Sequence, residues 1–126
     1  MRLDAIGITA KDVKASVAFY QMLGVGFAEC ENTAEHVEAT LPNGLRLMID
    51  SESLMKKLNP NWVEPKGQRM ALAFLCKSPG EVDEVFKKLM AAGYKASKEP
   101  WDAFWGQRYA TVLDPDGNGV DLFAQL

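Results

Sequence analysis

An acid inside an apolar segment near the C-terminus is the first candidate functional residue, because Asp121 lies between Val120 and Leu122. It follows a run of turn formers, Asp114-Pro115-Asp116-Gly117-Asn118, and residues 108–113 before the turn are rich in β-branched and aromatic side chains. These patterns predict a β-hairpin. Because side chains alternate along a strand, Asp121 points to one face of the sheet and its two apolar neighbours to the other. Such a carboxylate can ligate a metal or take part in acid-base chemistry.

Aromatic side chains form the second candidate site. Trp101, Phe104, Trp105 and Tyr109 lie close together in the chain, and Trp62 lies earlier, in a segment rich in proline and charge. Two interpretations fit the cluster. The rings stack on a flat or amphipathic ligand, or they close the end of the core or a dimer contact.

Residues beside these rings offer polar anchors for such a ligand. Gly106 would let the backbone approach it, and Arg108 would contact an anion or a carbonyl group. Asp102 and Glu99 would instead suit a cationic ligand.

The remaining reactive side chains are few. His36, the only histidine, lies on a predicted middle strand and is expected to be a solvated or core imidazole rather than a metal ligand. Cys30 and Cys76 lie in different apolar segments without a CxxC spacing, which favours two reduced thiols.

The overall composition predicts one compact domain, 1–126. With 126 residues, 48% of them hydrophobic and 25% charged, the chain can bury a core without disulfides. A net charge of -3, with no stripe of lysine and arginine, argues against a nucleic-acid partner. No apolar run is long enough to span a bilayer and the N-terminus does not resemble a signal peptide, so we expect a cytoplasmic protein without a membrane partner.

The elements that position these residues repeat along the chain. The first module, 1–50, is predicted to contain a strand over 3–10, a helix over 13–23 and strands over 25–31, 36–41 and 45–50. Asp12 is the expected N-cap of that helix and Gly24 its stop. A connector over 51–68, with a possible short helix over 52–58, follows.

The second module, 69–126, shows the same order. Ser78-Pro79-Gly80-Glu81 is a capping box that opens a helix over 81–92. Strands are predicted over 70–77, 94–98, 108–113 and 120–124. Residues 43–48 align with 118–123, and 5–8 align with 71–74, so both modules read βαβββ.

The paired modules and three local signatures resemble the vicinal oxygen chelate superfamily of glyoxalases, bleomycin resistance proteins and ring-cleaving dioxygenases. The signatures are Asp12 with Phe19-Tyr20, the end of the first helix at Leu23-Gly24, and the Asp-Pro-Asp-Gly-Asn turn shortly before Asp121-Leu122. The resemblance implies an α+β fold in which a mixed sheet curls round a cup, with the helices on its outer face. Metalloenzymes of that superfamily place four ligands inside the cup.

Carried onto this sequence, the four ligand positions fall on Ala5, Arg46, Ala71 and Asp121. Only Asp121 has a donor, because alanine has none and a guanidinium has no lone pair to give. We therefore expect no metal and no other cofactor. Arg46 and Asp121 are predicted either to pair inside the cup or, if the register slips by one residue, to leave Arg46 facing solvent.

The resemblance is greatest to the metal-free, bleomycin-resistance-like branch. It implies a protein, connected with antibiotic resistance, that sequesters a small aromatic or amphipathic molecule in the cup or at a homodimer contact without transforming it. Trp62, Trp101, Phe104, Trp105, Arg108 and Tyr109 are the expected binding residues. The alternatives are a lyase, isomerase or dioxygenase-like enzyme, and an interaction module whose sheet face is only a dimer seam.

Overall fold

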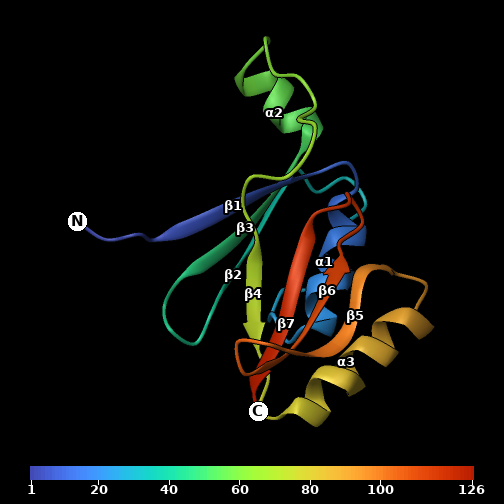
Figure 1. The fold of residues 1–126 in the computed structure, drawn as a ribbon. Coiled ribbons are helices and arrows are strands. Elements are labelled where there is room, and N and C mark those ends of the chain that lie inside the picture. The colour runs from blue at the N-terminus through green and yellow to red at the C-terminus, as the bar shows by residue number, and fades with distance from the viewer. The chain divides into compact units, whose positions relative to one another are not determined.

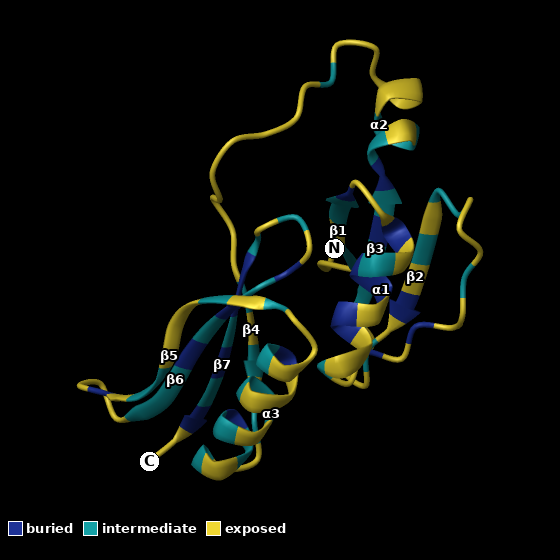
Figure 2. Ribbon diagram, turned by 90° about the vertical axis from the view of Figure 1, so that its right-hand side faces the viewer, coloured by how far each residue is buried: buried dark blue, intermediate teal, exposed yellow.

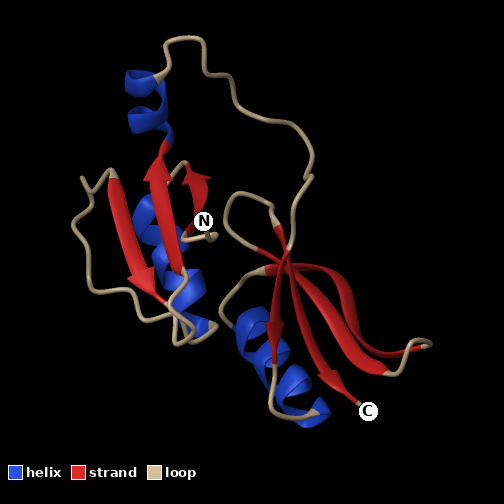
Figure 3. Cartoon of the chain, turned by 90° about the vertical axis from the view of Figure 1, so that its left-hand side faces the viewer, coloured by secondary structure: helices blue, strands red, loops and turns tan.

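The computed structural model describes all residues from Met1 to Leu126, which form two compact units. Unit 1 is Met1–Lys66 and unit 2 is Gly67–Leu126. Figures 1 and 3 show that each unit contains its own sheet with a helix lying along it. No helix of the chain is both long enough and apolar enough to cross a membrane.

Unit 1 is a three-stranded mixed sheet with α1 on one face. Its elements are β1 Ala5–Ala10, α1 Val13–Met22, β2 His36–Thr40, β3 Arg46–Ser51 and α2 Glu52–Leu58. The strand order is β1-β3-β2, with β1 parallel and β2 antiparallel to β3. The predicted cap is confirmed, because the Asp12 carboxylate accepts a hydrogen bond from the Ala15 N–H.

The core of unit 1 lies between α1 and β3. Phe19 and Tyr20 of α1 are fully buried and meet edge to face, and Leu47 and Ile49 of β3 are buried as well. Figure 2 shows buried stretches on both α1 and β3 in dark blue. Because β3 alternates, Arg46, Met48 and Asp50 point to the face opposite α1.

Unit 2 is a four-stranded mixed sheet with α3 on one face. Its elements are β4 Leu72–Leu75, α3 Pro79–Ala91, β5 Lys95–Ala103, β6 Gln107–Leu113 and β7 Gly119–Gln125. The strand order is β4-β7-β6-β5, with β4 parallel to β7 and the other pairs antiparallel. This is the predicted βαβββ module, and Pro79 begins its helix as expected.

The predicted strand over 25–31 is wrong, so unit 1 reads βαββ followed by α2. Val25 and Phe27 are buried, but their polar groups bond locally. The Phe27 N–H donates to the Val25 carbonyl, and the Gln21 side-chain amide donates to the Phe27 carbonyl. These contacts use groups that a sheet ladder would need, so the apolar pattern is buried without forming a strand.

Strand β5 extends beyond the predicted 94–98 and includes the first part of the aromatic segment. It reaches Ala103, with irregular register between Ala96 and Lys98 and between Lys98 and Trp101. Two irregularities explain the missed prediction, because each one breaks the alternation that identifies a strand. Trp101 is therefore held on a strand, opposite Tyr109 of β6.

Candidate functional site

Asp121 lies on the face of the unit 2 sheet opposite α3. Its neighbours Val120 and Leu122 are buried on the other side, as the alternation of β7 requires. Each of its carboxylate oxygens accepts a hydrogen bond from a hydroxyl group, one from Tyr109 at 2.8 Å and the other from Thr111 at 2.7 Å. Burial, and next the hydrogen bond and negative charge of Asp121, raise the pKa of Tyr109 to about 12, so this phenol stays neutral and donates.

The predicted aromatic cluster forms a continuous row on this same face. Ring centres are 5.0 Å apart for Phe104 and Trp105, 5.5 Å for Trp101 and Trp105, and 5.4 Å for Trp105 and Tyr109. Phe123 of β7 extends the row, since its ring stacks on Tyr109 at 6.0 Å. We call these five residues the aromatic row. Phe104 is 91% exposed and Trp105 48%, so the row is not the interior of a core.

Phe123 and Thr111 are the functional candidates that sequence reasoning missed. Phe123 is two residues after Asp121, and Thr111 pairs directly with Asp121 across the strands. The period of two along a strand would have placed Phe123 beside Asp121. Thr111 needed the pairing register of the hairpin.

Arg108 does not belong to the aromatic row. It alternates with Tyr109 on β6 and points to the α3 side, where its guanidinium bonds Asp83 at 2.9 Å and Asp102 at 3.1 Å. These two carboxylates raise the pKa of Arg108, Asp83 most strongly through its hydrogen bond. Glu99 lines a shallow hollow of about 360 Å³ on that side together with Arg108. Neither Arg108 nor Asp102 is free to anchor a ligand stacked on the row.

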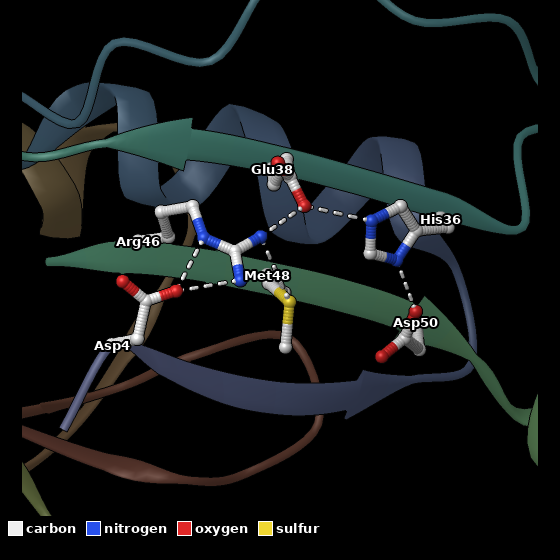
Figure 4. Close-up of polar contacts among 6 residues, drawn as sticks. All are labelled: Asp4, His36, Glu38, Arg46, Met48 and Asp50. Carbon is white, nitrogen blue, oxygen red and sulfur yellow. Dashed lines mark hydrogen bonds and ion pairs between the residues drawn. The ribbon is translucent and has the colours of Figure 1, made fainter. Parts of the chain in front are cut away.

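A second polar group of residues lies on the unit 1 sheet, on the face opposite α1 (Figure 4). The Arg46 guanidinium bonds Asp4 through Nε at 3.1 Å and Nη2 at 2.9 Å, and Glu38 through Nη1 at 2.8 Å. Met48 Sδ lies 3.8 Å from Nη1. The guanidinium is thus held by carboxylates that precede β1 and extend from β2, with its charge balanced inside unit 1.

His36 continues this polar row between two acids. Its Nε2 lies 3.0 Å from Glu38, on the same oxygen that Arg46 contacts, and its Nδ1 lies 2.5 Å from Asp50. Asp50, and next Glu38, raise the pKa of His36, while His36 and then Arg46 lower the pKa of Glu38. A protonated imidazole donates to both acids, so neither ring nitrogen has a free lone pair for a metal or a proton.

His36 makes the stability of unit 1 depend on pH. A group with a raised pKa stabilises the fold fully below its ordinary value, here 6.5, and loses that contribution as pH rises through the raised value. We therefore expect the melting temperature of the protein to exceed that of His36→Gln most at about pH 5 to 6, with the difference shrinking towards about pH 9.

Thermal melts of both proteins at low salt check this expectation. Lys57→Gln is the matched control, because it removes a different ion pair from the same unit, the one between Lys57 and Glu35 at 2.6 Å. A difference between the protein and His36→Gln that stays constant from acid to alkaline pH would contradict the assigned network.

The strand pairing of the two units places the family positions in registers that differ by two residues. Ala5 pairs with Arg46 across parallel strands in unit 1, and Ala73 pairs with Asp121 in unit 2. The counterpart of Ala5 by pairing is thus Ala73, two residues after the aligned Ala71, and both are alanine. Arg46 and Asp121 each have hydrogen-bonding partners inside their own unit, and their mutual pairing stays a prediction.

The other predicted residues lie apart from the aromatic row in the chain. Trp62 belongs to unit 1, where Lys56 Nζ lies 5.9 Å from its ring centre. Cys30 and Cys76 are free thiols, each half-buried. An open hollow of about 520 Å³ in unit 1 is lined by the start of α1 and residues 32–35, and no predicted site residue lines it.

Several proteins of known structure have a similar fold. A glyoxalase/bleomycin resistance protein/dioxygenase family enzyme from Burkholderia phytofirmans PsJN matches over 100% of both chains, with a TM-score of 0.86 and 21% identity. A glyoxalase/bleomycin resistance protein/dioxygenase from Nocardioides matches all of this chain and 84% of its own, with a TM-score of 0.76 and 25% identity. Lactoylglutathione lyase from Agrobacterium tumefaciens matches 98% of this chain and 92% of its own, with a TM-score of 0.71 and 18% identity.

Comparison of the amino-acid sequence with known proteins and families supports the structural matches. No curated protein matches the chain. The model of the Glyoxalase/Bleomycin resistance protein/Dioxygenase superfamily, however, matches residues 2–122. With the repeated modules and the hairpin that carries Asp121, this match shows that the chain belongs to the glyoxalase/bleomycin resistance protein/dioxygenase superfamily.

Proposed function

We propose that this protein binds a flat aromatic small molecule on the aromatic row of unit 2 and does so without a metal. The observation that carries the proposal is the row itself: five rings in edge-to-face or stacked contact, with Phe104 and Trp105 exposed. Exposed, contiguous aromatic surface on a rigid sheet is typical of a binding surface, and stacking on it needs little reorganisation of the protein.

The family positions do not fit a divalent metal. Ala5, Ala71 and Ala73 lack donor atoms, and Arg46 is itself a cation held by Asp4 and Glu38. Only Asp121 is a donor, and both of its oxygens already accept hydroxyls. No group of three or more His, Cys, Asp or Glu side chains in the chain could hold a metal ion. Transition metals need three or four converging donors.

An enzyme of the same superfamily is the competing function, and it would need an acid-base group. His36 is poorly suited, because both of its ring nitrogens face carboxylates. Asp121 is the remaining candidate, and a base has to have an oxygen available to a substrate proton. The two hydroxyl donors on Asp121 favour a binding role over a catalytic one.

Two measurements on the purified protein test the proposal together. Elemental analysis is expected to find no stoichiometric nickel, zinc, manganese or iron, because the donors are missing. Titration with quinoline, followed by tryptophan fluorescence, is expected to show saturable quenching through Trp101 and Trp105. One tightly held transition metal per chain, or quenching that never saturates, would overturn the proposal.

A gain-of-function variant provides the matched control for the metal. Ala5→His, Arg46→Glu, Ala73→His and Asp121→Glu together restore the donor types of the superfamily's metalloenzymes, with position 73 chosen because it pairs with Asp121. Metal uptake by this fourfold variant and not by the parent would show that the loss of donors explains the metal-free state. A homodimer, a link to antibiotic resistance and a cytoplasmic location stay predictions. Gel filtration with and without quinoline tests the first of these.

A further inference from the structure

Asp121 lies beside the aromatic row, and its negative charge has no role in the proposed function. Its carboxylate is half-buried among rings and accepts two neutral hydroxyls, which satisfy hydrogen bonds and leave the negative charge in place. The arginine of unit 2 nearest in sequence, Arg108, is paired with Asp83 and Asp102. No ion pair within unit 2 includes Asp121.

Arg46 and His36 of the unit 1 sheet are compensated, whereas the exposed Lys98 and Glu99 of β5 belong to no ion pair. Arg46 directs three donor atoms at Asp4 and Glu38, and His36 lies between Glu38 and Asp50. A carboxylate in apolar surroundings without a counter-charge costs free energy that a bound cation would recover.

The rings around Asp121 favour the same sign of charge. The faces of aromatic rings carry negative potential and attract cations within about 6 Å of the ring centre. Lys98 Nζ lies 4.8 Å from the centre of the Trp101 ring, which shows that the row accommodates a cation on a ring face. Trp105, Tyr109 and Phe123 extend the row from there towards Asp121.

We propose that the ligand of the aromatic row is a flat aromatic cation, whose rings contact Trp105 and Tyr109 and whose positive charge lies against Asp121. This inference rests on the proposed function and adds the charge class of the ligand. An aromatic anion would meet the carboxylate and the ring faces with the wrong sign, so the site selects against it.

Three bicyclic probes of similar size test the charge class: 1-methylquinolinium, quinoline and 2-naphthoate, titrated calorimetrically in weakly alkaline, low-salt buffer where quinoline is neutral. We expect 1-methylquinolinium to bind about tenfold more tightly than quinoline, and 2-naphthoate more weakly than both. Asp121→Asn should weaken binding of 1-methylquinolinium far more than binding of quinoline, and leave only the smaller preference that the ring faces provide. Both hydroxyl contacts can persist in this variant, because Tyr109 and Thr111 can accept as well as donate.

Glu99→Gln is the matched control, since it removes one negative charge from unit 2 on the α3 side, away from the row. It is expected to keep the tenfold preference. Equal affinities for 1-methylquinolinium and quinoline, or a tenfold preference that survives undiminished in Asp121→Asn, would overturn the charge assignment while the proposed function stands. Failure of all three probes to bind would overturn both.

Discussion

Asp114→Ala is expected to lower the free energy of unfolding by about 2 to 4 kcal/mol. Asp114 is only 4% exposed, and its carboxylate holds the turn before β7 together. Oδ1 accepts the backbone N–H groups of Asp116 and Asn118, both at 2.9 Å, and Oδ2 accepts the Asn118 side-chain amide at 2.9 Å. Alanine would leave these three donors without the acceptor that they share at the buried start of the turn.

Urea denaturation of the protein and two variants measures the effect. Asp114→Asn keeps one acceptor oxygen and should lose about half as much. Glu99→Ala, which removes an exposed carboxylate of the same unit, should change stability by less than about 0.5 kcal/mol. An Asp114→Ala variant as stable as the protein would mean that the turn forms without its carboxylate.

The same turn also positions the candidate site. Its geometry fixes which residues of β7 pair with β6, and in that register Asp121 lies opposite Thr111 and Phe123 opposite Tyr109. Losing the turn would therefore weaken ligand binding along with stability, because the acceptor and the rings would no longer share one face.

Trp105→Ala is expected to weaken binding of quinoline by about 1 to 3 kcal/mol, which is roughly fivefold to 150-fold in affinity. The Trp105 ring contacts Trp101, Phe104 and Tyr109, so it is the centre of the aromatic row. Its indole N–H donates to Gln107 at 2.8 Å, which fixes the orientation of the ring. Removing the central ring takes away stacking area and frees its neighbours to rotate.

Calorimetric titration compares Trp105→Ala with Trp105→Phe. The phenylalanine keeps a ring at the centre of the row and should keep most of the affinity, although it loses the hydrogen bond to Gln107. Because Trp105 is 48% exposed, neither change should lower the melting temperature much. Unchanged affinity in both variants would mean that quinoline binds elsewhere and would contradict the row as the ligand site.

Much of the fold was predictable because it is encoded locally. The caps at Asp12 and Ser78, the short helix Glu52–Leu58 and the turn before β7 each depend on neighbours in the chain, and all form as expected. Residues 25–31 were not predictable, because the competing hydrogen bonds of Phe27 come partly from a side chain on the preceding helix. Trp101 was not predicted to lie on a strand, because the irregular register of β5 interrupts the alternation of side chains.

Part of the candidate site was likewise predictable from the sequence, and part of it was not. The residue types alone show that the positions equivalent to the superfamily's metal ligands lack donors, since the side chains of alanine and arginine cannot ligate a metal in any conformation. The alternation that separates Asp121 from its buried neighbours is also visible in the sequence. Which rings meet and which charges are balanced depends on the folded structure. It joined Phe123 to the aromatic row, turned Arg108 towards Asp83, and gave Arg46 the carboxylates of Asp4 and Glu38. These contacts join residues far apart in the chain. Their partners are set by strand register and helix packing, and a local sequence pattern encodes neither of these.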